Sequence, residues 1–269
     1  MNSIKLKELE KGFKRVKNLG YVKSIADYSD GINNDGAVGE TFQYYFYGEA
    51  RDNRMGADWN GWEFKASRES TSSMRSLFTS KPTYPLDGDK LMREKWGRVD
   101  DNWPGVKFLM PTIPSEFGKY TKVHIKTHKV NPNQPVYLMR IENRRSEKKI
   151  SLIVKDINGK LIDDSIYWSY ENLKLRWDDK LKNTIFLNAK VKNENGIEYF
   201  FYEGATVMVG SKFNDFLNCI DKGLITYDPA HDVYKSGINI GKPHNHGGKF
   251  RFKKNKPLTE LSSEVYYLF

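Results

Sequence analysis

The sequence predicts a mixed α/β or α+β fold in which a central β-sheet is flanked by helices. Segments with the spacing of amphipathic helices are interleaved with short runs whose apolar residues alternate as in strands. Two connections between strand-like runs, Asn158-Gly159 and Asn195-Gly196, carry the dipeptide typical of tight hairpins. Because a hairpin joins antiparallel strands, a purely parallel sheet is not expected.

The helices are predicted from their apolar spacing. Residues 3–17 place Leu6, Leu9 and Phe13 on one face with lysines between them, and Gly20 ends the segment. A loop at 28–36, rich in Asp, Asn and Gly, precedes the second expected helix. The remaining helices are expected at residues 38–47, 88–97, 170–181 and 211–222.

The strands are predicted from alternation and from their bounding turns. Residues 98–135 carry five prolines and little periodicity, which favours loops or an insertion. The strands are expected at residues 62–66, 136–141, 149–154, 184–192, 197–202 and 249–253.

The net charge of the chain indicates which class of partner the protein binds. The chain has 269 residues and a net charge of +10, from 44 lysines and arginines against 34 acids, which favours a polyanionic partner such as nucleic acid. The alternative is a lysine-rich bias of the whole proteome.

A single cysteine, Cys219, excludes an internal disulfide or a cysteine zinc site. No apolar leader or membrane-length run occurs, so we expect an intracellular, cytoplasmic protein that does not contact a membrane.

An acidic cluster, Asp58 with Glu63 and Lys65, is the strongest candidate for chemistry. Alternation places Glu63 and Lys65 on one strand face, with Asp58 at a turn before it. Two carboxylates can hold Mg²⁺, and a lysine beside them can orient a water molecule and offset charge on a phosphate. Metal-dependent phosphodiesterases need this arrangement. The alternative is a solvated strand face with a weak Glu/Lys pair.

The predicted helix at 38–47 lies just upstream of this cluster. Its residues Glu40 and Gln43 share a face and are candidates to stand beside the acids. Alternatively, Glu40 is an acid that favours the first turn of its helix.

A basic segment near the C-terminus is the second candidate. Lys249, Arg251 and Lys253 alternate with two phenylalanines, so a strand there buries the rings and directs three cations outward. Such cations can contact guanine edges and phosphates. Further candidate DNA-binding residues in this region are His231, Lys235, Lys242, His244 and His246. The alternatives are a zinc site at the His-x-His pair and a plain solvated hairpin.

Several motifs occur in a fixed order along most of the chain. They comprise residues 36–42, the acidic cluster, 77–82, 164–170, 179–182, 234–237, 244–247 and 250–251. Together they resemble the MvaI/BcnI type of restriction endonuclease, which is related to the mismatch-repair nickase MutH.

The resemblance implies a restriction-endonuclease-like fold with a DNA-reading subdomain that forms a cleft. It implies a monomeric endonuclease that uses Mg²⁺, with Mn²⁺ able to substitute, and that cuts one strand of double-stranded DNA per binding event. The site would be short and nearly palindromic, of the CCWGG or CCSGG kind. Asp58 and Glu63 would bind the metal, Lys65 would position the water, and His244, His246 and Arg251 would read bases.

The resemblance also implies an organisation and a genetic partner. Residues 1–100 and parts of 136–210 would form the catalytic core of a single nuclease chain, and 211–269 mainly the recognition part. A DNA methyltransferase encoded nearby would protect the host DNA.

Two departures from the family pattern keep other functions open. Gln43 stands where the family has a glutamate, with Glu40 one turn earlier, and Ala230 stands where relatives have an arginine. Loss of that arginine removes a candidate guanine contact. A MutH-like nickase of repair or methylation-dependent defence, and a DNA-binding protein with impaired catalysis, are therefore the alternative functions.

Overall fold

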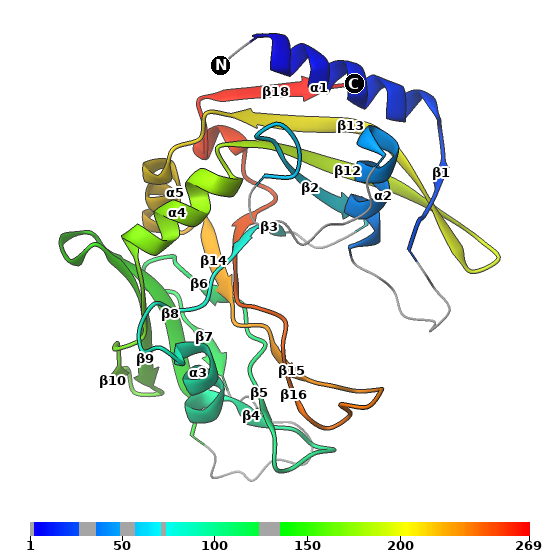
Figure 1. Ribbon diagram of the computed structural model, residues 1–269. Helices are drawn as coiled ribbons and strands as arrows, with labels where there is room; N and C mark the ends of the chain where they lie inside the picture. The colour runs from blue at the N-terminus through cyan, green and yellow to red at the C-terminus, as the bar shows by residue number, and fades with distance from the viewer. Residues whose placement is uncertain (1–2, 27–35, 49–56, 71–73, 124–134) are drawn as a thin grey trace. The chain divides into compact units, whose positions relative to one another are not determined.

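The computed structural model describes residues 3–26, 36–48, 57–70, 74–123 and 135–269. The chain forms two compact units, each built from separate stretches of sequence (Figure 1). Unit 1 comprises Met1–Ser73, Trp177–Lys212 and Pro257–Phe269, and unit 2 comprises Met74–Arg176 and Phe213–Lys256. The sequence predicted a catalytic core and a recognition part with other boundaries. That division of roles stays a prediction.

Unit 1 is one mixed sheet with two helices. Its strands run in the order β1-β13-β12-β2, and β18 pairs with the same strand, β13, that β1 contacts. Strand β2 is parallel to β12, whereas the other pairs are antiparallel. The elements are α1 (Ser3–Asn18), β1 (Val22–Lys23), α2 (Ala37–Tyr47), β2 (Glu63–Arg68), β12 (Asn183–Glu194), β13 (Ile197–Val209), η2 (Leu258–Glu260) and β18 (Glu264–Leu268).

Both helices of unit 1 pack on the same face of the sheet. Phe13 of α1 and Phe42 of α2 are fully buried, and they share a core with Trp62 and Phe64 on the β2 side. Phe42 and Phe64 meet edge to face, with ring centroids 5.5 Å apart. Alternation along β2 therefore directs Glu63 to the opposite face, as the sequence predicts.

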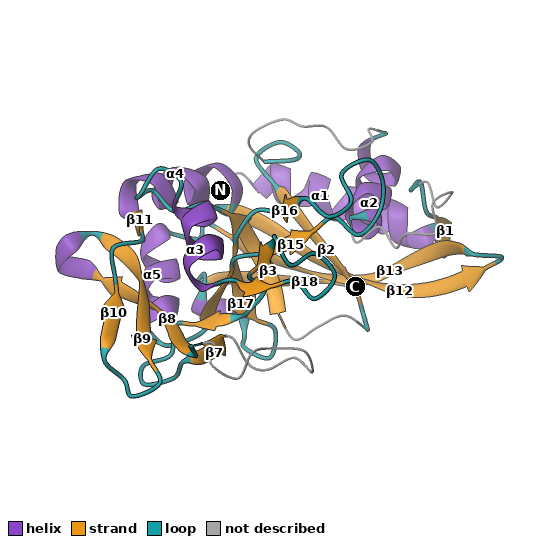
Figure 2. Ribbon diagram, turned by 90° about the horizontal axis from the view of Figure 1, so that it is seen from below, coloured by secondary structure: helices purple, strands orange, loops and turns teal. Residues whose placement is uncertain are grey.

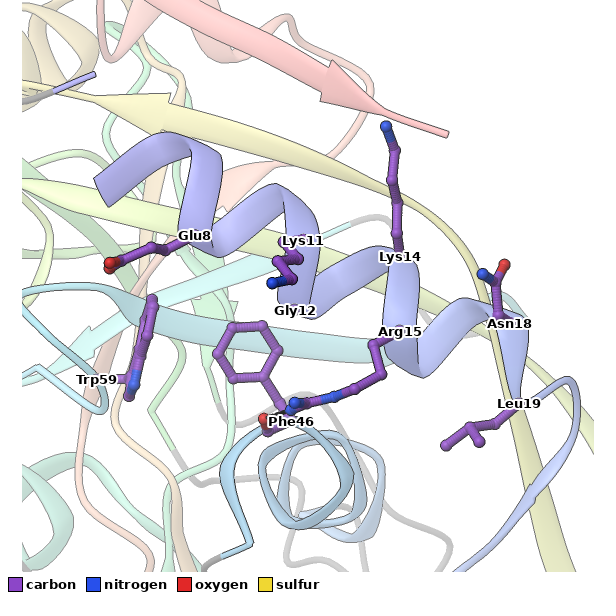
Figure 3. Close-up of a pocket in the computed structure, with 9 residues that line it drawn as sticks. All are labelled: Glu8, Lys11, Gly12, Lys14, Arg15, Asn18, Leu19, Phe46 and Trp59. Carbon is purple, nitrogen blue, oxygen red and sulfur yellow. Dashed lines mark hydrogen bonds between the residues drawn. The ribbon is translucent and has the colours of Figure 1, made fainter. Parts of the chain in front are cut away.

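The two helices approach each other at Gly12. A Cβ atom there would lie 2.3 Å from the ring of Phe46, so only glycine fits. Beside this contact is a hollow whose lining includes Glu8, Lys11 and Trp59 (Figure 3). The guanidinium of Arg15 donates a hydrogen bond to the Phe46 carbonyl near the end of α2.

Strands β12 and β13 form a long hairpin (Figure 2). Its two turn residues, Asn195 and Gly196, have φ values of 53° and 79°. Positive φ at both positions is typical of the type I′ turn, and this confirms the hairpin predicted from the Asn-Gly pair.

Unit 2 contains two further sheets, of order β3-β17-β14-β6 and β10-β9-β8-β7, with β11 also paired to β9. Strands β15 and β16, like β4 and β5, form separate two-stranded pairs. The strands are β3 (Met74–Thr79), β4 (Arg98–Val99), β5 (Lys107–Phe108), β6 (Ile113–Pro114), β7 (Thr121–Val123), β8 (Tyr137–Arg144), β9 (Lys149–Asp156), β10 (Leu161–Asp163), β11 (Tyr167–Ser169), β14 (Ile225–Asp228), β15 (His231–Val233), β16 (Pro243–Asn245) and β17 (Lys249–Lys253). The helices are α3 (Gly88–Trp96), η1 (Arg145–Glu147), α4 (Tyr170–Lys180), whose last turn belongs to unit 1, and α5 (Phe213–Asp221).

The core of unit 2 is aromatic. Phe250 of β17 is fully buried, with its ring centroid 5.1–5.5 Å from those of four other rings. These are Phe78, Trp168, Phe216 and Tyr227. The predicted inward direction of the β17 phenylalanines is therefore confirmed.

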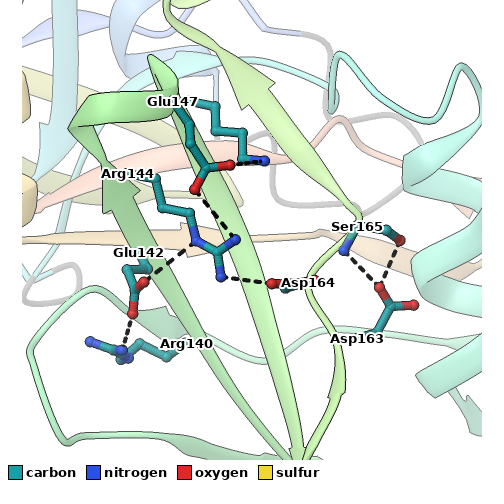
Figure 4. A network of polar contacts seen from close by, with 8 residues as sticks. Arg140, Glu142, Arg144, Glu147, Asp163, Asp164 and Ser165 are labelled. Carbon is teal, nitrogen blue, oxygen red and sulfur yellow. Dashed lines mark hydrogen bonds and ion pairs between the residues drawn. The ribbon is translucent and has the colours of Figure 1, made fainter.

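Charged side chains form a connected network over β8 and β9 (Figure 4). Arg144 donates to Asp164 at 2.8 Å and also lies 3.5 Å from Glu142, which in turn accepts from Arg140. The partly exposed pairs of this network, such as Arg144 with Asp164, contribute about 0–1 kcal/mol each. We therefore assign the network to local order of this sheet.

The mixed α+β fold predicted from the sequence is confirmed, including the expected helices. Residues 98–123, expected as loops or an insertion, form four short strands, β4 to β7. Most of the loop expected at 28–36 lies outside the described residues. Within the described part of the chain, no helix is both long and apolar enough to cross a membrane.

Candidate functional site

A two-residue turn brings Asp58 next to strand β2. Trp59 and Trp62 exchange backbone hydrogen bonds of 3.0 and 2.7 Å around Asn60 and Gly61. Both turn residues have positive φ, 46° and 83°, as in a type I′ turn. The chain folds back so that Oδ2 of Asp58 accepts the backbone N–H of Phe64 at 2.7 Å.

Gly61→Ala is expected to destabilise this turn. No atom lies within 4 Å of an added Cβ, so the cost is the left-handed backbone alone, about 1–2 kcal/mol. Thermal or denaturant unfolding measures it. Gly105→Ala is the control, because Gly105 has equally open surroundings without a positive φ. An equal effect of both substitutions would contradict the account of the turn.

Glu63 is buried, with 3% of its surface exposed, and its carboxylate meets two ammonium groups. Lys65 Nζ donates to Glu63 Oε1 at 2.5 Å, and Lys180 Nζ lies 4.0 Å from the same oxygen. The other oxygen, Oε2, is buried without a hydrogen-bond partner in the described structure. This carboxylate oxygen can therefore accept a bond from a cation or a water molecule.

The charges of this cluster and its burial also change the pKa of Asp58. Desolvation of its carboxyl group, reinforced by the charge of Glu63, raises the pKa of Asp58 from 3.8 to about 6. The Phe64 N–H and the charges of Lys65 and Lys180 oppose the rise in pKa. Asp58 as a whole residue remains exposed, so solvent reaches it. A cation bound here would relieve the repulsion between the two carboxylates.

Asp58→Asn is expected to stabilise the metal-free protein at pH 8. Between pH 4 and about 6 the folded state binds more protons than the unfolded chain, because the folded pKa is the higher one. The contribution of Asp58 to stability therefore falls as pH rises through this window. Thermal unfolding in EDTA should show the gain from Asn at pH 8 and its disappearance near pH 4. A gain of equal size at both pH values would contradict the assignment.

The cluster fits a hard divalent cation. No group of three or more His, Cys, Asp or Glu side chains that could hold a metal occurs among the described residues. Mg²⁺ commonly takes one or two protein carboxylates and keeps several waters, so the pair of Asp58 and Glu63 suffices. The unpartnered Oε2 of Glu63 is the observation that supports this fit.

The α2 candidates, Glu40 and Gln43, lie on the helix that packs against the core face of β2. A Cβ at Gly39 would lie 3.8 Å from the Cβ of Ala66, which shows how closely α2 approaches the strand. Glu40 and Gln43 are both half-buried. Their participation in the site stays a prediction.

In unit 2, the ring of His244 contacts two other rings. Its centroid lies 3.9 Å from that of Tyr234, nearly parallel at 11°, and 3.8 Å from that of His246. Desolvation, together with the adjacent His244, lowers the pKa of His246. Nearby, Lys235 pairs with Asp232 at 3.4 Å, and Lys242 donates to an asparagine at 3.2 Å.

In contrast to His244 and His246, His231 lies in the interior of unit 2. Only 1% of its surface is exposed, and its backbone exchanges hydrogen bonds with Leu109. Desolvation lowers the pKa of its imidazole, whose nitrogens lack hydrogen-bond partners in the described structure. No pattern in the sequence indicated this burial. In this conformation His231 is not available to a ligand at the surface.

The three alternating cations of β17 are each half-buried, on the side opposite the phenylalanines. Arg251 Nη1 donates to Asp228 Oδ2 on the adjacent strand β14 at 2.6 Å. Lys253 Nζ donates to Glu116 at 3.2 Å. Acids thus fix two of the cations, whereas the ammonium group of Lys249 has no hydrogen bond or ion pair in the described structure.

The comparisons identify the family. A model of the MvaI/BcnI restriction endonuclease family matches residues 10–259. The chain belongs to this family. Among solved structures it is similar to the restriction endonuclease MvaI in complex with its cognate DNA substrate, with a TM-score of 0.81 and 26% identity over 98% of both chains. It is also similar to MvaI without DNA, with a TM-score of 0.57 and 26% identity over 98% of this chain and 97% of the other. No curated protein matches.

Membership of the MvaI/BcnI family makes this protein a type II site-specific deoxyribonuclease, which confirms the expected enzyme class. Sequence reasoning missed two residues beside Glu63. One is Lys180, and the other is Thr184, the fully buried register partner of Glu63 on β12. The parallel pairing of β2 with β12 reveals Thr184, whereas Lys180 lies in the motif at 179–182, to which the sequence analysis assigned no role.

Proposed function

We propose that this restriction endonuclease hydrolyses DNA phosphodiester bonds with Mg²⁺ held by Asp58 and Glu63. The observation that carries the proposal is the pair of carboxylates beside Lys65, one of them with a buried oxygen that lacks a partner. Mn²⁺ is expected to substitute, because it also accepts carboxylate and water ligands.

The residues of the acidic cluster would have different roles in phosphodiester hydrolysis. Bound Mg²⁺ would supply Lewis-acid polarisation of the phosphate and a more acidic water. Lys65, fixed by its 2.5 Å contact with Glu63, presents an ammonium that orients the attacking water and offsets phosphate charge. Asp58 is anchored by the Phe64 N–H through Oδ2, which leaves Oδ1 to face a ligand. Glu40 and Gln43 are kept as candidates that support this cluster from α2.

For DNA recognition we propose the surface residues of unit 2. The paired rings of His244 and His246 offer imidazole donors and acceptors to base edges, and Arg251 offers a fork suited to guanine. The lysines of this region, Lys235, Lys242, Lys249 and Lys253, would neutralise phosphates. His231 is left out of this set, since it is buried.

We further propose a short, nearly palindromic target of the CCNGG kind, cut one strand at a time by a monomer. Support comes from the family and from the similarity to MvaI in its cognate DNA complex. Ala230 in place of the family arginine would alter which base pair is read. A cytoplasmic location and a protective DNA methyltransferase belong to the same proposal.

Arg251→Ala is expected to relax or abolish site discrimination, since a bidentate guanine contact is worth about 1–3 kcal/mol. Lys254→Ala, three residues on, should instead weaken binding evenly across sequences and flatten its salt dependence. Competition binding with matched and mismatched duplexes at several salt concentrations separates the two effects. Altered sequence preference in Lys254→Ala would overturn this sorting of contacts.

Plasmid digestion tests the proposed function. Discrete fragments are expected in Mg²⁺ and none in EDTA, and sequencing their ends gives the target. Accumulation of open circles before linear DNA would support cutting one strand at a time. Nicking that requires a repair partner or a methylated strand would favour the MutH-like alternative, and binding without any cut would refute catalysis.

A further inference from the structure

The strand face that carries Glu63 and Lys65 continues to Ser67. Because side chains alternate along a strand, Ser67 projects from β2 on the same face as the two catalytic candidates. Its register partner on β12 is Asn188, and Ser67 Oγ donates a hydrogen bond to Asn188 Oδ1 at 3.1 Å. Asn188 is exposed and Ser67 is half-buried. A polar pair therefore stands on the face of the proposed metal site.

The hydrogen bond from Ser67 determines which end of the Asn188 amide stays free. Oδ1 accepts the serine hydroxyl, so the Nδ2 group is directed away from that contact. Nδ2 carries two N–H donors and makes no hydrogen bond within the described residues. An anion needs donors of this kind, and asparagine is among the side chains that bind DNA phosphates.

The space beside the amide of Asn188 is open. Its register partner on β13 is Gly204, which has no side chain to cover the amide. The register shifts between Asn188 and Lys190, and a bulge of this kind often redirects a side chain next to an active site. Asn188 also borders a hollow whose lining includes Lys190, Thr206 and Tyr267. A ligand can therefore reach the amide.

The charges around this hollow are balanced. The lining includes two lysines, Lys17 and Lys190, and two acids, Glu69 and Glu203. Lys190 pairs with Glu203 at 2.7 Å. Net charge alone therefore does not attract an anion to this position. Directed hydrogen-bond donors would have to hold it, and the amide of Asn188 supplies two.

The spacing along β2 matches the spacing of a DNA backbone. Two residues of a strand rise about 6.6 Å, and this rise separates Ser67 from Lys65. Successive phosphates of a B-DNA strand rise about 3.4 Å along the axis, and because the strand winds around that axis, the phosphates themselves lie nearly twice as far apart. A DNA strand that follows β2 with one phosphate at Lys65 would bring the next phosphate to Ser67 and Asn188.

A simpler role for the pair is to link β2 to β12, since cross-strand side-chain pairs stabilise a sheet. That role uses only Oδ1 of Asn188 and leaves the donors of Nδ2 without a purpose. Aspartate in place of Asn188 keeps an acceptor for the Ser67 hydroxyl but places a negative charge against a phosphate. This substitution therefore separates the two roles.

We propose that Ser67 and Asn188 form a second phosphate subsite, in which Nδ2 of Asn188 binds the DNA phosphate next to the scissile one. Ser67 is a positioning residue, because it acts through the orientation of the amide. The inference rests on the proposed function, since the scissile phosphate at the metal site sets the register of the DNA strand. Contact with its neighbour would align the scissile phosphate with Lys65 and the attacking water.

Single-turnover cleavage of duplexes that carry one neutral methylphosphonate tests the inference. The duplex contains the target found by plasmid digestion, and the methylphosphonate replaces each phosphate near the cut in turn. At one neighbour of the scissile phosphate it is expected to slow the wild type on the order of 10-fold at enzyme concentrations below saturation, as loss of a hydrogen bond to a charged group does. Asn188→Ala should cut the unmodified duplex more slowly by a similar factor and be insensitive to the methylphosphonate at that neighbour.

Two further variants distinguish phosphate binding from a structural role. Asn188→Asp should unfold at the same temperature as the wild type but cut the unmodified duplex more slowly than Asn188→Ala. The methylphosphonate should restore part of its rate, because it removes the repulsion between the two negative charges. Asn18→Ala, which removes an exposed amide from the end of α1, should cut like the wild type.

Three results would decide against the inference. Wild-type speed in both Asn188→Ala and Asn188→Asp would overturn it while leaving the proposed function intact. Equal slowing of the wild type and Asn188→Ala by the methylphosphonate at every position would also overturn it, because the amide would then contact none of these phosphates. A wild-type protein that fails to cut the unmodified duplex in Mg²⁺ would overturn the proposed function, and this inference with it.

Discussion

Replacing Glu63 with glutamine is expected to slow DNA cleavage by at least about 10²–10³-fold while DNA binding is retained. Glutamine keeps the shape of this buried side chain but removes its charge. The cluster then loses a metal ligand, and Lys65 loses the carboxylate that fixes its ammonium at 2.5 Å. Both losses raise the free energy of the transition state rather than weaken DNA binding, because the metal and the oriented water act in the transition state.

Glu69→Gln is the matched control for this substitution. Glu69 follows the end of strand β2 and is exposed, so the same loss of charge occurs away from the cluster. Cleavage by this variant should stay close to that of the wild type. Gel-shift titration in EDTA reports binding separately. Equal cleavage by Glu63→Gln and the wild type would remove Glu63 from the catalytic assignment.

Replacing Phe250 with alanine is expected to destabilise unit 2 by about 3–5 kcal/mol. Four aromatic rings surround this fully buried side chain, so its removal leaves a cavity that they fill only in part. Because Arg251 is its neighbour on β17, loss of this core also releases a proposed base-reading side chain. Denaturant unfolding followed by the fluorescence of the chain's six tryptophans, of which Trp168 belongs to this cluster, measures the change.

Phe117→Ala provides the comparison within the same unit. Phe117 is 86% exposed, and the guanidinium of Arg140 lies 5.3 Å from its ring, a contact worth about 0.5–1 kcal/mol at an exposed site. A small effect is therefore expected. If the two alanine variants unfold alike, the aromatic cluster is not the core of unit 2.

Local patterns predicted the parts of the catalytic cluster that lie close in sequence. Alternation placed Glu63 and Lys65 on one face of a strand, and the glycines indicated a turn near Asp58. Lys180 and Thr184 were not predictable in this way. Thr184 lies opposite Glu63 because β12 pairs in parallel with β2, and Lys180 ends the helix that precedes β12. Nothing in either strand alone specifies that partner or its register.

In the basic segment, too, the sequence predicted contacts within the strand but not contacts with residues far away in the chain. The Phe250 and Phe252 alternation predicted which side of β17 is buried. It did not predict that Asp228 and Glu116 would hold Arg251 and Lys253, because those acids come from other segments. His231 was expected among the DNA-binding residues, but it is buried and its backbone exchanges hydrogen bonds with Leu109.

A crystal soaked in Mn²⁺ and measured at the manganese absorption edge tests the central claim most directly. We expect one anomalous peak within coordinating distance of both Asp58 and Glu63, and none there in Glu63→Gln. A wild-type enzyme that cuts DNA in Mn²⁺ but shows its bound ion away from both carboxylates would contradict the account.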